Sequence, residues 1–242
     1  MLTQSSQVNL DLDIFFWEID HILLFTESIS NISILQEFGL HCSKQVVHHL
    51  EQGTASVVIF FENIYIELVW IENRDIVKQC TKFKGLDILT HSNWQQTGAS
   101  PFGIGLRAKP EKTKIKSQFE KRKIKKQNLN FSAKFSSENL SQIEEPVFFL
   151  VPDKLALTSW LDCSFTKHQQ LITHPLGVKK LTKINLGLDT NKKLTNTICL
   201  LEQNQIVSIK MNTAPLLELT FDNNYQDRVI NLQPLLPIRI MF

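Results

Sequence analysis

Short apolar runs separated by polar turns open the chain, in an order typical of one supersecondary unit. Residues 19–26 are rich in Ile, Leu and Phe and predict a strand. Apolar positions at helical spacing over residues 30–38, followed by Gly39, predict a short helix. Three more strand-like runs follow, at 42–50, 54–61 and 64–71. The predicted order is β-α-β-β-β.

Strand patterns return later in the chain, on both sides of a long polar stretch. Residues 102–107 and 146–151 predict strands, and the residues between them are rich in Lys and Ser. In the C-terminal third, residues 181–188 predict a strand and residues 194–201 predict a helix. The remaining apolar runs predict a hairpin made of 206–211 and 216–221, and an edge strand at 238–242.

Two segments of the C-terminal third echo the first unit. Ile19-Asp-His-Ile-Leu-Leu is similar to Leu181-Thr-Lys-Ile-Asn-Leu, and Tyr65-Ile-Glu-Leu-Val is similar to Leu216-Leu-Glu-Leu-Thr. Self-similarity of this kind indicates a duplicated module. We therefore expect one compact two-module domain. Its parts are a first βαβββ module with the first strand of the next unit (14–108), a Lys/Ser-rich excursion (109–144) and a second, abbreviated module (145–242).

The composition is ordinary for a soluble globular protein, with 43% hydrophobic and 21% charged residues among 242. No apolar run is long enough to span a bilayer, and residues 1–13 lack the basic and apolar parts of a secretory signal. The four cysteines are scattered without a Cys-x-x-Cys pair, which argues against a zinc ribbon or a disulfide framework. We expect a cytoplasmic protein without a membrane partner.

Basic charge is concentrated in one segment. Residues 107–126 contain ten Lys or Arg and two Glu, whereas the remainder holds 16 basic and 22 acidic residues. A nucleic-acid-binding arm is one interpretation, but Phe119 is the only aromatic residue there for base stacking, and blocks of like charge are usually solvated. The pattern does not favour nucleic acid as a partner.

Two polar residues interrupt otherwise apolar strands. Glu67 shares one strand face with Tyr65 and Val69, and His21 is flanked by Ile22 and Leu23. A buried carboxylate needs a metal, a cation, hydrogen-bond donors or a proton. Carboxylate and neutral imidazole both suit divalent metals. Hydrogen bonding within the core is the alternative, and residue patterning leaves both open.

The second unit repeats this arrangement with one change. Glu218 takes the place of Glu67, and Lys183 takes the place of His21. If the modules pair symmetrically, all four side chains converge on one cavity, where Lys183 could neutralise Glu218. The connection from His49 to Thr54 adds a polar loop, with Gln52 and Thr54 as donors, which suits either ligand contacts or an exposed turn.

Several enzyme classes lack their motifs. The glycines of residues 98–107 do not follow a strand and open a helix, as a dinucleotide-binding fingerprint requires. Gly-x-Ser-x-Gly and His-Glu-x-x-His are absent.

The motifs together resemble the glyoxalase-like proteins of the vicinal-oxygen-chelate superfamily, which are common in bacteria. The match runs in order from about residue 19 to residue 240. The residues that carry it are Asp20-His21, His49-x-x-Gln-Gly-Thr54, Phe60-Phe-Glu-Asn-x-Tyr-x-Glu-Leu-x-Trp70, Thr97-Gly-Ala-Ser-Pro-Phe-Gly-Ile-x-Leu-Arg107, Glu145-Pro146, His174-Pro175 and Leu217-Glu-Leu-x-Phe-Asp222.

The resemblance implies an α+β fold of paired βαβββ modules, whose curled mixed sheets enclose a cavity. Superfamily members often bind a divalent metal through a first-strand His and a fourth-strand Glu, and the metal polarises vicinal oxygens of a small molecule. The implied metal ligands are His21, Glu67 and Glu218. The implied catalytic groups are Glu67 and Glu218, and the expected substrate contacts are His49, Gln52, Thr54 and Lys183.

Departures from the family pattern keep two functions open. The family's His-Pro-Gly-Gln-Gly-Thr is His49-Leu-Glu-Gln-Gly-Thr54 here, and its aromatic middle segment is the Lys-rich one. Its terminal His-Trp is Met241-Phe242. The chain is expected to be a metal-dependent lyase, isomerase or dioxygenase, or else a non-catalytic small-molecule binder. A homodimer is compatible with either.

Overall fold

Two mixed β-sheets form the body of the computed structural model, which describes residues 17–27, 31–84, 86–109, 134–189 and 191–242. The larger sheet has the order β2-β3-β4-β1-β5-β7-β6, and the smaller has the order β11-β12-β10-β8-β9. The first sheet contains β1 (Trp17–Phe25), β2 (Val47–His49), β3 (Thr54–Phe60), β4 (Tyr65–Ile71), β5 (Phe102–Ala108), β6 (Lys134–Phe135) and β7 (Val147–Leu150). The second contains β8 (Leu181–Leu188), β9 (Ser208–Met211), β10 (Leu216–Phe221), β11 (Val229–Asn231) and β12 (Ile238–Met241).

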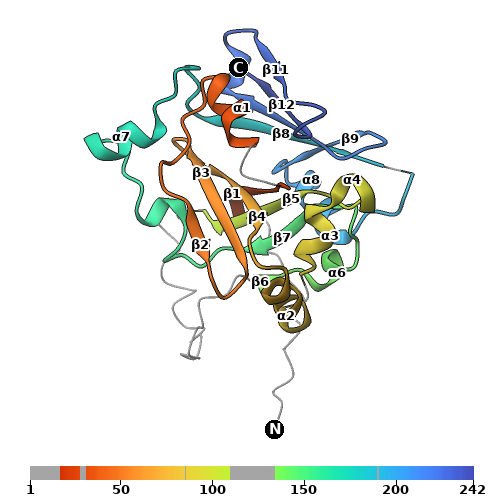
Figure 1. The fold of residues 1–242 in the computed structure, drawn as a ribbon. Coiled ribbons are helices and arrows are strands. Elements are labelled where there is room, and N and C mark those ends of the chain that lie inside the picture. Colours follow the sequence, from red (N-terminus) through yellow and green to blue (C-terminus); the bar gives the residue numbers. More distant parts are fainter. Residues whose placement is uncertain (1–16, 28–30, 85, 110–133, 190) are drawn as a thin grey trace, which may run out of the picture.

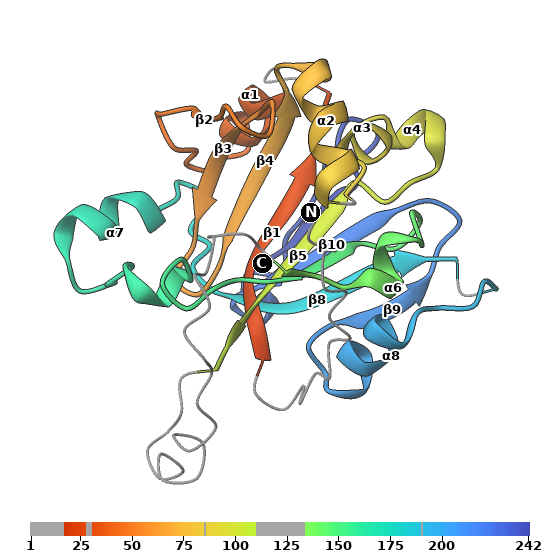
Figure 2. The same cartoon turned by 90° about the horizontal axis from the view of Figure 1, so that it is seen from below.

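Short helices connect and cover the strands, so the chain is α+β (Figure 1). Figure 2 shows that α7 projects sideways from the body. No helix among the described residues is long and apolar enough to cross a membrane. The α-helices are α1 (Asn31–Glu37), α2 (Arg74–Lys84), α3 (Ile88–Ser92), α4 (Trp94–Thr97), α6 (Ser137–Leu140), α7 (Thr166–Ile172) and α8 (Asn196–Gln203), and the 3-10 turns are η2 (Leu157–Ser159) and η3 (Asp222–Asn224).

The predicted first βαβββ unit is present as β1, α1, β2, β3 and β4. β1 and β4 pair in parallel, while β3 pairs antiparallel with both β4 and β2. The second strand is shorter than the predicted 42–50. Near its expected start, the Ser43 hydroxyl accepts the Val58 amide, which replaces a ladder hydrogen bond with a side-chain one.

The main hydrophobic core lies between the two sheets. Ile22 and Leu24 of β1 pack in one cluster with Leu217 and Leu219 of β10, together with Ile198 of α8. The opposite face of the larger sheet is covered in part by α2 and α3, and a smaller cluster lies there. Figure 1 shows the larger sheet between these two layers. Because side chains alternate along a strand, His21, Leu23 and Phe25 of β1 face away from the smaller sheet.

Strand pairing in the C-terminal sheet differs from the prediction. β8 lies between β9 and β10, so residues 206–211 and 216–221 do not form a hairpin. β12 is not an edge strand, because β11 covers its outer side. β8 and β10 are antiparallel, whereas β1 and β4 are parallel. The predicted likeness of these two pairs is therefore wrong at the level of topology. The helix α8 returns the chain so that β9 joins β8 in parallel.

The real internal repetition lies within the larger sheet. β1 and β5 are antiparallel to each other, and each has a parallel neighbour, β4 and β7 respectively. That neighbour in turn has an antiparallel partner, β3 or β6. The structural counterparts of β1 and β4 are thus β5 and β7, and not strands of the C-terminal third.

Two buried histidines should make folding sensitive to acid. Burial lowers the pKa of both His91 and His174. His174 accepts the His41 amide at Nδ1 and donates from Nε2 to the Phe60 carbonyl, so it needs one protonated and one bare nitrogen. In the unfolded chain the two imidazoles take up protons near pH 6.5. In the folded chain their lowered pKa means that they take up protons only at lower pH.

We therefore expect the free energy of unfolding in urea to be highest above about pH 6.5 and to fall as the pH drops from 7.5 to 5.5. In His174→Gln the fall should be smaller, because the amide accepts and donates without titrating. An unchanged dependence on pH in this variant would contradict the assignment.

Candidate functional site: the His21 pocket

A pocket of about 300 Å³ opens on the face of the larger sheet that points away from the C-terminal sheet. We call it the His21 pocket. Its polar wall comes from β1, β4 and the loop before β3, and its apolar wall from β7, the residues after it and α3. It is lined by His21, Leu23, Phe25, His49, Gln52, Thr54, Tyr65, Glu67, Val69, Leu86, Ile88, Phe135, Phe149, Val151, Pro152 and Leu155.

A β-bulge places Asp20 behind the pocket. The register between β1 and β5 shifts between Ile19 and His21, so Asp20 has no partner on β5. Its fully buried carboxylate accepts His21 Nδ1–H at 2.8 Å, the Leu157 amide at 2.8 Å and Arg107 Nη1 at 3.1 Å. Burial alone would raise the pKa of Asp20, but these three partners together hold it below its ordinary value.

The charged Asp20 fixes how His21 presents its ring. A carboxylate can only accept, so Nδ1 carries the proton, and in the neutral ring the lone pair is on Nε2. Tyr65 stacks on the ring at a centroid distance of 4.3 Å, and Phe149 meets it edge-on at 5.2 Å. A side chain at Gly105 would come within 2.9 Å of His21 Cε1, so glycine is required there. Nε2 has no hydrogen-bond partner among the described residues, which leaves it available to a ligand.

Glu67 is the second acceptor of the polar wall, on the strand face shared with Tyr65 and Val69, as predicted. Its side chain is 15% exposed, and His49 Nε2 lies 3.3 Å from Oε1. Burial raises the pKa of Glu67, but hydrogen bonds from His49 and Ser56 outweigh this and lower it. Glu67 is therefore an ionised carboxylate at neutral pH.

The predicted polar loop also reaches this pocket, since His49, Gln52 and Thr54 line it. Gly53 adopts φ +72°, and its carbonyl accepts the amides of Glu72 and Asn73. These bonds attach the loop to the turn after β4 and hold it at the edge of the pocket.

Glu218 and Lys183 do not join His21 and Glu67. Leu217 and Leu219 face the core between the sheets, so Glu218 points to the opposite, outer face of the smaller sheet. There Lys210, Arg239 and Asn185 bind its carboxylate. Burial raises the pKa of Glu218, and its partners, Lys210 first, bring it below its ordinary value. The predicted convergence is wrong because His21 and Glu218 lie on opposite outer surfaces of the two-sheet body.

The metal set that the resemblance implies does not fit this arrangement. The part of the chain that the structure describes contains no group of three or more His, Cys, Asp or Glu side chains placed to hold a metal ion. Only His21 and Glu67 of the predicted ligands share a pocket. The counterparts of their strands are β5 and β7, where the same face carries Gly103, Gly105 and Phe149 and offers no ligand.

Sequence patterning did not assign roles to Asp20 and Arg107, which support His21 from behind. The available signal was charge inside apolar strands: Asp20 between Ile19 and His21, and Arg107 at the end of β5. Arg107 joins Asp20 to Glu18 and to the Asn63 carbonyl.

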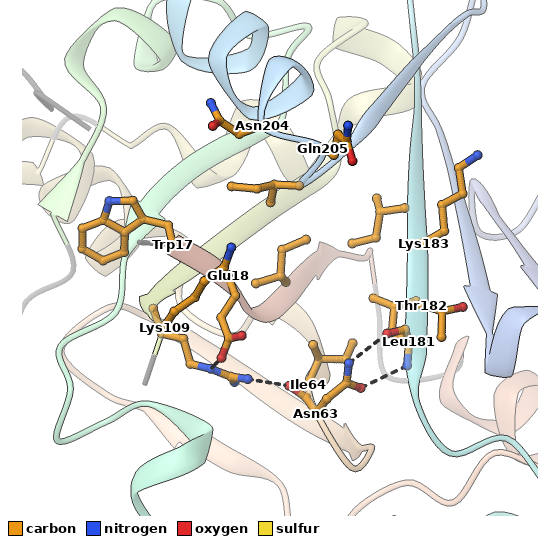
Figure 3. A pocket seen from close by; sticks show the side chains of 14 residues that line it. Trp17, Glu18, Asn63, Ile64, Lys109, Leu181, Thr182, Lys183, Asn204 and Gln205 are labelled. Atoms are coloured by element: carbon orange, nitrogen blue, oxygen red, sulfur yellow. Dashed lines mark hydrogen bonds and ion pairs between the residues drawn. The ribbon is translucent and has the colours of Figure 1, made fainter. Parts of the chain in front are cut away.

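Arg107 also lines a second cavity, which we call the Arg107 pocket and which includes Lys183 in its lining (Figure 3). Of the basic segment 107–126, residues 110–126 lie outside the described residues.

Comparison with known proteins supports the fold and leaves the family open. No protein-family model matches the sequence, and no curated protein matches it. The fold is similar to that in a crystal structure of a hypothetical protein from Staphylococcus aureus, with a TM-score of 0.54 and 13% identity. The similarity covers 93% of this chain and 98% of that one, so it extends over nearly the full length of both.

Proposed function

We propose that the chain is a glyoxalase-like protein that binds a small oxygenated molecule in the His21 pocket. The βαβββ order of the first unit supports the resemblance, and His21 and Glu67, its two central residues, line one cavity. The observation that carries the proposal is the pocket's division into a polar wall with two fixed acceptors and an opposing apolar wall.

The two acceptors select the kind of ligand. His21 Nε2 offers a lone pair, and Glu67 is charged, so a bound molecule must donate hydrogen bonds to them. A carboxylate ligand would meet the charge of Glu67 and be repelled, whereas a hydroxyl would be held. Phe149, Val151 and Leu155 offer contact to a hydrocarbon portion. The preferred ligand is therefore a neutral hydroxyl compound with a compact apolar body.

Benzyl alcohol tests this function, with methyl benzyl ether as the probe of similar shape that has no donor. NMR of the labelled full chain should show benzyl alcohol shifting signals of the His21 pocket, and the ether binding much more weakly. Glu67→Gln and His21→Phe should each weaken the binding of benzyl alcohol by about tenfold. This is the loss in affinity expected when one hydrogen bond to a charged or well-positioned acceptor is removed. His48→Gln, outside the pocket lining, should leave the affinity unchanged.

Equal binding of the ether, or unchanged affinity in both pocket variants, would overturn the proposal. The titration is run in excess chelator and again with added Zn²⁺ or Mn²⁺. Binding that persists in chelator supports direct acceptance by His21 and Glu67. Binding that requires the metal would instead favour the metal-dependent lyase, isomerase or dioxygenase that the resemblance implies.

A further inference from the structure

The Arg107 pocket is a cavity of about 240 Å³ at the junction of the two sheets. Its walls come from the start of β1, the turn between β3 and β4, the end of β5, β8 and the residues after α8 (Figure 3). It shares no lining residue with the His21 pocket. The two cavities are therefore separate sites.

Arg107 and Lys109 bring positive charge to this cavity. Arg107, Lys109 and Lys183 line it, against the single carboxylate of Glu18. Neither lysine has an ion-pair partner among the described residues. Lys183, however, shares its strand face with Asn185 on the outer side of the smaller sheet, and Figure 3 shows its side chain directed away from the cavity. Asp20 lies behind Arg107 and offsets part of this charge. An anion that displaces Glu18 can pair with Arg107 and lie close to Lys109, and the low exposure of Arg107 limits screening of that pair by salt.

Glu18 already shows how a carboxylate binds here. It accepts Arg107 Nε–H at 2.7 Å, while the other two guanidinium nitrogens donate to Asp20 and to the Asn63 carbonyl. The Glu18 side chain is 34% exposed and that of Asp20 is fully buried. Of the two carboxylates on Arg107, Glu18 is the one that an incoming anion can displace without exposing the interior.

The rest of the lining suits an organic body rather than a bare inorganic ion. Trp17, Ile19 and Ile206 supply apolar surface, and Asn204 and Gln205 supply amides at the rim. We propose that the Arg107 pocket binds a small organic anion whose carboxylate takes the place of Glu18 on Arg107 and whose flat apolar body lies against Trp17. Glu18 is then an internal competitor for the ligand.

Benzoate is the probe, and benzyl alcohol is the neutral molecule of the same shape. Both are titrated into the full chain at constant ionic strength, and NMR follows the Trp17 indole and the Gln205 amide. Benzoate should shift these two signals, and benzyl alcohol should not. Because benzyl alcohol reports on the His21 pocket, failure of one site is distinguishable from failure of the other.

Charge variants give opposite expected results. Glu18→Gln should bind benzoate about threefold more tightly, since the competitor is removed, and Lys109→Gln should weaken benzoate binding about threefold. Lys179→Gln, an exposed lysine outside the pocket lining, serves as the control and should match the wild type. Lys109 is exposed, so its variant tests the proposal even if Glu18→Gln fails to fold. Equal shifts with benzyl alcohol, or unchanged benzoate affinity in Lys109→Gln, would overturn it.

Discussion

Replacing Arg107 with Met should destabilise the protein by about 3 to 5 kcal/mol, because it leaves the buried charge of Asp20 without its cation. The Arg107 side chain is 5% exposed and that of Asp20 is fully buried, so water cannot take over the lost interaction. The change also releases Glu18 and the Asn63 carbonyl. The free energy of unfolding in urea measures the loss.

Two further variants separate the ion pair from simple loss of packing. Asp20→Asn combined with Arg107→Met removes both buried charges, and the double variant should be more stable than Arg107→Met alone. Lys192→Met breaks the exposed pair with Glu144 and should have little effect. A double variant that is less stable than Arg107→Met would mean that packing, rather than the unpaired carboxylate, dominates.

Local patterning in the sequence is enough to predict the first βαβββ unit and the part of the His21 pocket that comes from β4 and the His49–Thr54 connection. Alternation along residues 64–71 places Glu67 on the face that lines the pocket, and the His49–Thr54 connection lies beside it. Local sequence also marks the start of α2, where the Asn73 side chain accepts the amides of Asp75 and Ile76. The helix itself is largely polar, so apolar periodicity does not predict it.

The rest of the site depends on contacts distant in sequence. The Leu-Glu-Leu pattern around Glu218 resembles the one around Glu67, but alternation cannot say which sheet a strand joins or which face is covered. The bulge at Asp20 arises where β1 pairs with β5, and Asp20 lies 87 residues from Arg107, to which it is hydrogen-bonded. Asp20's support of His21 therefore emerges only when the sheet is assembled.

Gly53→Ala should be the most damaging small substitution in the loop of the His21 pocket. The residue has φ +72°, and an added Cβ would lie 2.5 Å from the Asn73 carbonyl oxygen and 2.9 Å from Ile76 Cβ. The left-handed backbone costs a non-glycine residue about 1 to 2 kcal/mol, and the clash with rigid backbone adds about 1 to 3 kcal/mol. Moving this turn also displaces Gln52 and Thr54, so benzyl alcohol should bind more weakly.

Gly98→Ala is the matched control for the backbone contribution. Gly98 has the same φ of +72°, but nothing lies within 4 Å of the position its Cβ would take. This variant should show only the conformational cost, and it should bind benzyl alcohol as the wild type does, because Gly98 does not line the pocket. Urea unfolding and the NMR titration are compared for both variants. Equal loss of stability in the two would show that the turn after β4 yields to the added methyl group, so that the loop is not held rigidly beside the pocket.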